Sequence, residues 1–190
     1  MAPAAGTCNG RIIMQSITVA IVDDNEGRRE KFERYLQHEQ GIMVLRNVAS
    51  SKKEMSVDRR LNQRSSITDI DNVIASVRRL NPRILLANLK QCTDADCALL
   101  MALRRECPNT FVVMLADTSS LPEDQVVQAL ESGARGYLNI ESELPHLSRA
   151  VHVIDRGEAW VPRKILGKMM NTVLQWCHGG SIEAQLDPAS

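Results

Sequence analysis

The sequence lacks any excess of charge, and this absence argues against whole classes of partner. Lysine plus arginine and aspartate plus glutamate both number 23 in 190 residues, so the formal net charge is +0. Without net charge, the chain as a whole has no electrostatic drive to dock on DNA or on an anionic membrane. The basic residues between Lys52 and Arg64 are a local exception, and we expect them to form a solvated loop.

Cysteine pairs and long apolar runs are also missing. The 5 cysteines are odd in number and none stands in a Cys-x-x-Cys spacing, which argues against a disulfide framework or a zinc ribbon. Free thiols in a reducing compartment fit this usage. No apolar run approaches the roughly 20 residues of a membrane-spanning helix, and residues 1–13 lack the basic region and apolar core of a signal peptide. We therefore expect a cytoplasmic protein with no membrane partner.

What the sequence does contain is a regular alternation of short apolar runs and amphipathic segments. The runs are predicted strands at residues 17–22, 42–48, 83–89, 110–116 and 135–140. Amphipathic helices are predicted between and after them, the first capped by Asn25 and stopped by Gly41. This alternation predicts an α/β doubly wound fold with a parallel sheet covered on both faces. For five such strands we expect the flavodoxin-like order 2-1-3-4-5.

Composition divides the chain into three regions. Residues 1–15 are expected to be a flexible arm and residues 16–160 the α/β domain. Within that domain, the polar stretch over about 50–69 has no clear periodicity and predicts an insertion, with the helical pattern recovering at Ile70. Residues 161–190 are expected to form an extra helix followed by a linker or tail. The apolar positions of that helix, which we expect along one side and in contact with a partner, are Ile165, Leu166, Met169, Val173 and Leu174.

Polar residues follow two strands that the expected order makes neighbours. Asp23 and Asp24 come directly after the first strand, and Asn88 lies at the end of the third. The carboxyl ends of such strands face a common crevice at the switch point of the sheet. Paired carboxylates there suit Mg²⁺, which prefers oxygen ligands and usually helps to hold a phosphoryl group. The alternative is an acidic loop in which one residue caps the first helix.

Two segments resemble the receiver domain of bacterial response regulators. "ITVAIVDDNEGRREKFERYL" is similar to the family's first strand, acidic pair and first helix. "ESGARGYLNIESELPHLSRAVHVIDRGEAWVP" is similar to its last strand and helix, above all in the LuxR/NarL-type class. The resemblance covers Ile17 to Pro162. It implies a two-component signalling domain that is phosphorylated on an aspartate at the end of the third strand.

Three positions depart from what this resemblance implies. The phosphoacceptor position has Asn88, the hydroxyl position after the fourth strand has Ala116, and the lysine position after the fifth has Ile140. An amide does not attack phosphorus as a carboxylate does, alanine has no hydroxyl to bind phosphoryl oxygens, and isoleucine brings no cation. The resemblance therefore predicts an atypical receiver with a degenerate phosphorylation pocket.

Other positions follow the family. Asp23 and Asp24 match its metal-binding acids, and Tyr137 matches the aromatic residue that rotates in activated receivers. We expect Tyr137 to be a partly buried strand residue. Because the lysine position is uncharged, a third carboxylate beside Asp23 and Asp24 would add like-charge repulsion. A neutral Asn88 relieves that repulsion. We expect no resident cofactor, with Mg²⁺ at Asp23 and Asp24 as the one candidate.

Taken together, the sequence predicts a phosphorylation-independent, receiver-like signalling module. We expect it to act by protein–protein contact, to form a homodimer, and to regulate transcription or a two-component pathway. The rival interpretation is the regulatory half of a LuxR/NarL-type transcription factor, whose helix-turn-helix domain would lie outside residues 1–190. A Mg²⁺-dependent phosphatase or a flavin-binding enzyme is a third class. The spacing of the acids in "DDNEG" does not suit the phosphatase, and the acidic run after the first strand would repel the phosphate of a flavin. The sequence leaves open whether a small ligand, or a redox signal at Cys92 and Cys97, replaces phosphate as the input signal.

Overall fold

A single parallel sheet organises the protein. The structure is a computed structural model that describes residues 16–46, 62–88, 97–116 and 122–179. The sheet has the order β2-β1-β3-β4-β5, with the bounds β1 (Ile17–Val22), β2 (Ile42–Leu45), β3 (Ile84–Asn88), β4 (Phe111–Ala116) and β5 (Gly136–Asn139). The doubly wound fold and the strand order predicted from the sequence are confirmed.

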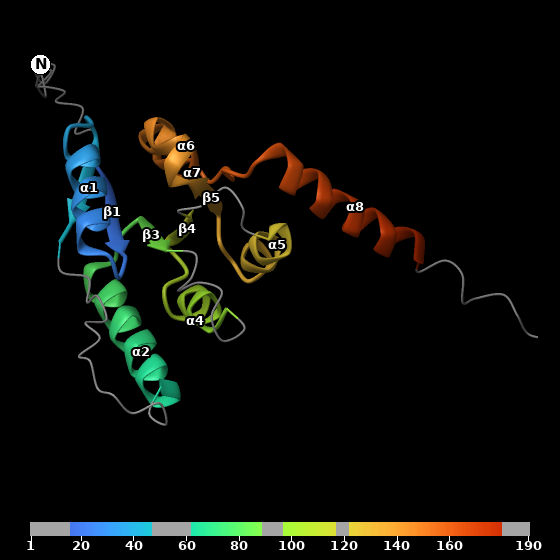
Figure 1. Cartoon of the computed structure of the whole chain (residues 1–190), viewed down its shortest axis with the longest axis horizontal. Helices are drawn as coiled ribbons and strands as arrows, with labels where there is room; N and C mark the ends of the chain where they lie inside the picture. The colour runs from blue at the N-terminus through green and yellow to red at the C-terminus, as the bar shows by residue number, and fades with distance from the viewer. Residues whose placement is uncertain (1–15, 47–61, 89–96, 117–121, 180–190) are drawn as a thin grey trace, which may run out of the picture.

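Helices cover both faces of this sheet (Figure 1). One face packs against α1 (Glu26–Gln37) and α7 (Leu147–Asp155), and the other against α2 (Asn62–Leu80), α4 (Ala98–Glu106) and α5 (Glu123–Glu131). Two short elements, α6 (Ile140–Glu143) and η1 (Leu144–His146), join β5 to α7. The last helix, α8 (Arg163–Gly179), runs outward from α5 (Figure 1). Within the described ranges, no helix is both long enough and apolar enough to cross a membrane.

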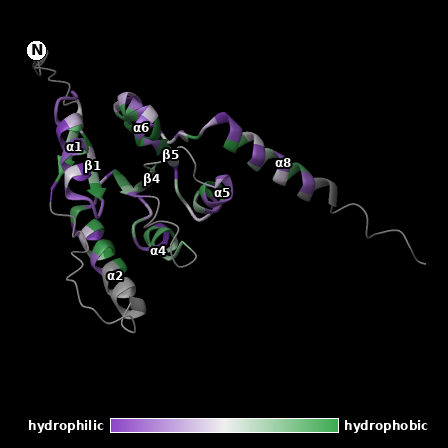
Figure 2. Cartoon of the chain, viewed as in Figure 1, coloured by the Kyte–Doolittle hydropathy of each residue, from purple (hydrophilic) through white to green (hydrophobic). Residues whose placement is uncertain are grey.

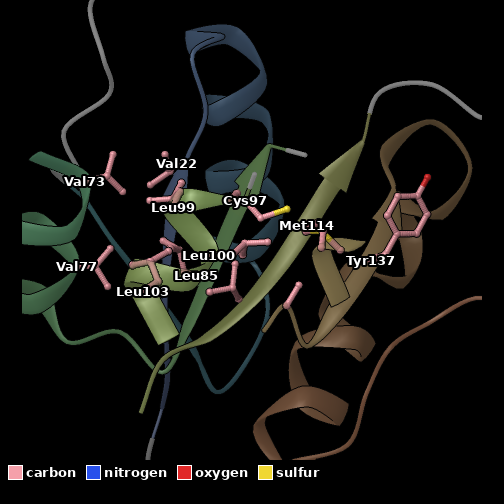
Figure 3. Close-up of a cluster of buried hydrophobic side chains, with 14 of the residues drawn as sticks. Val22, Val73, Val77, Leu85, Cys97, Leu99, Leu100, Leu103, Met114 and Tyr137 are labelled. Atoms are coloured by element: carbon pink, nitrogen blue, oxygen red, sulfur yellow. The ribbon is translucent and has the colours of Figure 1, made fainter. Parts of the chain in front are cut away.

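The pleat of the strands divides the core into two apolar clusters. In β1, Val19 and Ile21 pack toward Phe32 of α1, whereas Ala20 and Val22 belong to the cluster on the opposite face. Figure 3 shows that second cluster, which joins side chains of β3 and β4 to those of α2 and α4. All residues of β3 are buried, as a short continuous apolar run predicts for a strand covered on both faces.

The first helix begins where the sequence indicates but ends earlier than predicted. The side chain of Asn25 caps α1 by accepting a hydrogen bond from the backbone N–H of Arg28 at 3.0 Å. Gly41, which follows the helix, adopts a positive φ of 81°, a conformation that glycine takes without a steric penalty. The predicted cap is therefore confirmed. The predicted stop is not, because α1 ends at Gln37 with His38 as its C-cap, and Gly41 instead forms the turn before β2.

The predicted start of the second helix is wrong. We expected the helical pattern to begin at Ile70, but α2 begins at Asn62, inside the stretch 50–69 that was predicted as an insertion. The segment "NQRSS" contains no apolar residue, so it gives no hydrophobic periodicity from which a helix can be recognised. Residues 50–61 of that stretch, the predicted arm at 1–15 and the tail at 180–190 lie outside the described residues.

The close approach at Gly136 generates a stability prediction. A Cβ at this position would lie 2.9 Å from Cδ1 of Ile154 and 3.2 Å from the backbone oxygen of Trp160. We expect Gly136→Ala to lower the free energy of unfolding by about 1–3 kcal/mol through overpacking, as measured by urea denaturation. The matched control is Gly167→Ala in α8, where a Cβ would meet no atom within 4 Å. That variant should be neutral or gain up to about 1 kcal/mol, and equal losses in both would contradict the packing argument.

Candidate functional site

The predicted pocket residues gather at one edge of the sheet. Asp23 comes directly after β1, and Asn88 ends β3, which pairs with β1. Ala116 ends β4, and Ile140 comes directly after β5, the strand that pairs with β4. Because all four strands are parallel, these positions meet at the carboxyl edge of the sheet, where α/β proteins place their sites.

Asp23 is fully buried and forms an ion pair with an arginine of the first helix. Its exposed fraction is 0%. Nε of Arg28 donates to Oδ2 at 2.6 Å, and Nη2 donates to Oδ1 at 2.6 Å. The backbone N–H of Asn25 donates a further bond to Oδ1 at 2.8 Å. This bidentate, charge-assisted arrangement satisfies both oxygens of a buried carboxylate from within the chain.

Sequence reasoning missed Arg28. The residue lies in the first turn of α1, where the Asn25 cap holds its backbone N–H. Helical side chains lean toward the N-terminus of their helix, so the guanidinium reaches back to the end of β1. The contact crosses a turn between a strand and a helix, and no periodic pattern marks such a pair. The alternative of an acidic loop in which one residue caps the first helix agrees with this turn, because Asn25 is the cap and its N–H donates to Asp23.

The two acids do not act as one metal site in this arrangement. Asp24 is exposed, whereas Asp23 is buried beneath Arg28. Within the described residues, no group of three or more histidine, cysteine, aspartate or glutamate side chains is placed to hold a metal ion. A divalent ion at Asp23 would also lie against a guanidinium, and like charges in a buried site repel strongly. The residues as they stand do not fit the Mg²⁺ that the family resemblance implies.

The other pocket positions lie within the core. Asn88 is 6% exposed at the end of β3. Ala116 belongs to the apolar cluster that packs under α2, α4 and α5, and Ile140 belongs to the opposite cluster together with Leu115 and Leu147. Ala116 and Ile140, which the resemblance matches to the hydroxyl and lysine positions of a receiver, therefore contribute apolar packing.

A capped turn fixes Ile140 in this place. Oδ1 of Asn139 accepts hydrogen bonds from the backbone N–H groups of Glu141 and Ser142 at 2.9 and 3.4 Å. Oε2 of Glu143 accepts one from the N–H of Asn139 at 2.8 Å. This reciprocal pattern resembles a capping box and starts α6 directly at the end of β5. Ile140, predicted as the last strand residue, is thus the first residue of a helix.

Tyr137 is buried in β5. It is 8% exposed and belongs to the same apolar cluster as Ala116 and Ile165, and Figure 3 shows it at the edge of that cluster. Burial, and secondarily the negative charge of Glu143, raise the pKa of Tyr137 above its usual value of 10.0. The phenol is therefore neutral across the physiological range.

The apolar residues of α8 form two stripes, where the sequence suggested one. Ile165 is 5% exposed, and Met169 packs against the same cluster as Tyr137. The second stripe is exposed to solvent by about half of each side chain and consists of Leu166, Met170, Val173 and Leu174. Figure 2 shows hydrophobic residues in green and hydrophilic residues in purple along α8. We call this second set the exposed stripe of α8.

Ion pairs attach the start of α8 to the start of α5. Nζ of Lys168 lies 2.5 Å from Oδ1 of Asp124, and Lys164 pairs with Glu123. The hydrogen bond that Lys168 donates to Asp124, followed by the negative charges of Asp124 and Glu123, raises the pKa of Lys168 above its usual value. The first turns of α8 are therefore held to the domain, and its exposed stripe faces away from it.

Comparison with known proteins agrees with this fold. No family model matches the chain. The response regulator protein VraR of Staphylococcus aureus is 26% identical over 156 residues, which cover 82% of this chain and only 65% of VraR. A solved LuxR-family response regulator from Aurantimonas sp. SI85-9A1 superposes with a TM-score of 0.63 at 17% identity, over 84% of this chain and 99% of that chain. The receiver domain of RcsB from Salmonella enterica serovar Typhimurium gives 0.60 at 14% identity, over 82% and 99%.

The buried ion pair predicts unequal roles for two adjacent arginines. Arg28→Ala leaves the carboxylate of Asp23 buried without its partner, which should lower the free energy of unfolding by about 3 kcal/mol. The control is Arg29→Ala, which removes only looser pairs with Glu26 at 3.5 Å and Glu33 at 4.0 Å and should cost about 1 kcal/mol or less. Chemical denaturation of both variants checks this, and similar losses would refute it.

Proposed function

We propose that this chain, a receiver domain related to the NarL/LuxR class of response regulators, is a signalling module that works without phosphorylation and acts through protein–protein contact. The observation that carries the proposal is the burial of the residues at the predicted pocket. Asn88 is buried at the phosphoacceptor position, and Ala116 and Ile140 pack into opposite apolar clusters. Residues placed in this way stabilise the hydrophobic core, and they do not supply the groups that phosphorylation needs.

Each replacement removes a different part of phosphoryl transfer. The amide of Asn88 does not form an acyl phosphate, and Ala116 offers no hydrogen bond to phosphoryl oxygens. The surroundings of Ile140 also matter, because this side chain is 7% exposed and packs in an apolar cluster, where burial of a lysine ammonium would be unfavourable. The pocket would therefore need repacking, as well as a new nucleophile, to regain the reaction.

The output surface that we propose is the exposed stripe of α8. Four of the six exposed large hydrophobic residues in the described part of the chain lie on this one helix. Such a stripe is stabilised by a partner, and we propose a second copy of the chain. RcsB, which has the same receiver fold, has been solved as two dimers bound to two parallel DNAs. We propose that this domain likewise works as a dimer, in the cytoplasm, to regulate transcription or a two-component pathway.

A second candidate is the regulatory half of a DNA-binding transcription factor. The observation that favours it is the partial coverage of VraR, since the match leaves the remainder of that relative unpaired. In this version nucleic acid is bound by a separate domain, and residues 16–179 supply only the regulatory contacts. Both candidates make the domain a signalling unit instead of a catalyst.

The absence of phosphorylation is tested by intact mass after incubation with Mg²⁺ and acetyl phosphate. We expect no adduct on the wild-type chain, because Asn88 replaces the nucleophile and Ile140 replaces the cation. The matched control is Asn88→Asp, which restores the nucleophile alone and should also gain little or no adduct. A base-labile phosphate on the wild-type chain would refute the proposal, and its site could then be mapped by peptide analysis.

The dimer is tested by exchanging exposed apolar residues for charge. We expect Val173→Lys in α8 to weaken self-association at least about tenfold, since burial of one such side chain contributes about 1.5 kcal/mol or more. Met101→Lys in α4 is the control, because Met101 is similarly exposed, at 60% against 54% for Val173, but lies on another helix. Sedimentation equilibrium reports both. A monomeric wild-type chain, or equal weakening by both variants, would contradict dimerisation through α8.

A further inference from the structure

We propose that the guanidinium of Arg28 is the resident cation of this pocket and takes the place of a divalent metal ion. The inference rests on the proposed function and deepens it, because it names what holds the pocket in one state without metal or phosphate. Its basis is the bidentate contact of Arg28 with Asp23, described above at 2.6 Å for each bond.

The charges of the buried side chains support this assignment. Asp23 is the one charged residue among the buried residues that the structure describes. The other buried polar residues of that set are neutral, and they are Ser76, Asn88, Thr110 and Asn139. An uncompensated carboxylate in such a place would be strongly unfavourable. Arg28 supplies the compensation, so the buried part of the pocket has no net charge left to attract a metal ion.

The geometry also favours arginine over a competing ion. The planar guanidinium fork fits a carboxylate with two parallel hydrogen bonds and keeps its charge at all physiological pH values. The side chain of Arg28 is itself only 19% exposed. Its backbone N–H is fixed by the Asn25 cap, and the N–H of Asn25 in turn donates to Asp23. The cation is therefore held beside its partner by the same turn that starts α1.

Three residues are consistent in charge in this view. Asn88 is neutral at the end of β3, Ile140 brings no positive charge after β5, and Arg28 places a positive charge beside the end of β1. The positive charge of this edge is therefore supplied by α1 and is part of the fold. A pocket of this kind is independent of the metal concentration around it.

The test uses Mn²⁺ alone as the probe, with free Mn²⁺ measured by electron paramagnetic resonance during a protein titration. Asn88→Asp supplies an additional carboxylate, so that any remaining barrier to metal is the arginine. We expect the wild-type chain and Asn88→Asp to bind weakly. Asn88→Asp combined with Arg28→Met should bind at least about tenfold more tightly, since a unit charge a few ångströms away has been removed. This gain should be lost on adding Asp23→Asn.

The control adds Arg29→Met to Asn88→Asp, which removes a neighbouring arginine of α1 that does not contact Asp23 in the structure. It should leave Mn²⁺ binding unchanged. The proposal is overturned if Asn88→Asp alone binds as tightly as its Arg28→Met combination, or if that combination gains nothing. Circular dichroism and thermal melts establish that each variant is folded.

A second measurement needs no variant. In the wild-type chain the Nε–H of Arg28 should exchange slowly and give a nuclear magnetic resonance signal that millimolar Mg²⁺ does not change. Loss of that signal on adding Mg²⁺ would overturn the proposal even if every variant misfolded. Neither readout involves phosphate. A phosphate adduct on the wild-type chain would therefore refute the proposed function, whereas the role of Arg28 is decided by Mn²⁺ binding and by the Nε–H signal alone.

Discussion

Burial of the central strands on both faces is the constraint on which the rest of this structure depends. With every side chain of β3 inside the protein, a polar group at the carboxyl edge of the sheet is stable only if it is neutral and hydrogen-bonded, or charged and paired. The edge residues follow this rule. Asp23 is paired with Arg28, while Ala116 and Ile140 add to the two apolar clusters. The one charge buried at this edge is thus compensated, and the remaining positions are neutral or apolar.

The residues at this edge fit one another in charge, which is why they are best understood as a unit. Arg28 compensates the buried carboxylate of Asp23, and the neutral Asn88 adds no second buried carboxylate that would need a cation. The capped turn formed by Asn139 and Glu143 completes the arrangement, because it turns the start of α6 so that Ile140 reaches the core. Under the proposed function this domain acts through its surface, and four of the six exposed large hydrophobic residues in the described part of the chain lie on α8.

Much of the fold was predictable from the sequence, because it follows from periodicity and from the topology of parallel sheets. Alternating runs gave the strands, and the switch-point rule placed Asp23 next to Asn88 at one edge. The failures have physical causes. Arg28 was missed because a contact across a turn has no periodic signature, and the start of α2 because its first residues are all polar. The division of α8 into two stripes depends on where α5 lies, which is tertiary information that a single helical pattern does not contain.

The way α8 is attached has a mechanical consequence. Its first turns are held by Ile165 in the core and by the pairs of Lys164 and Lys168 with α5, whereas the side chains at 173–175 are exposed. A helix of 17 residues is about 25 Å long, so a tilt of about 10° at its base moves the far end by about 4 Å. Because α8 is held near its start, on α5, a small rotation there produces a larger displacement of its distal residues, which include Val173 and Leu174 of the exposed stripe.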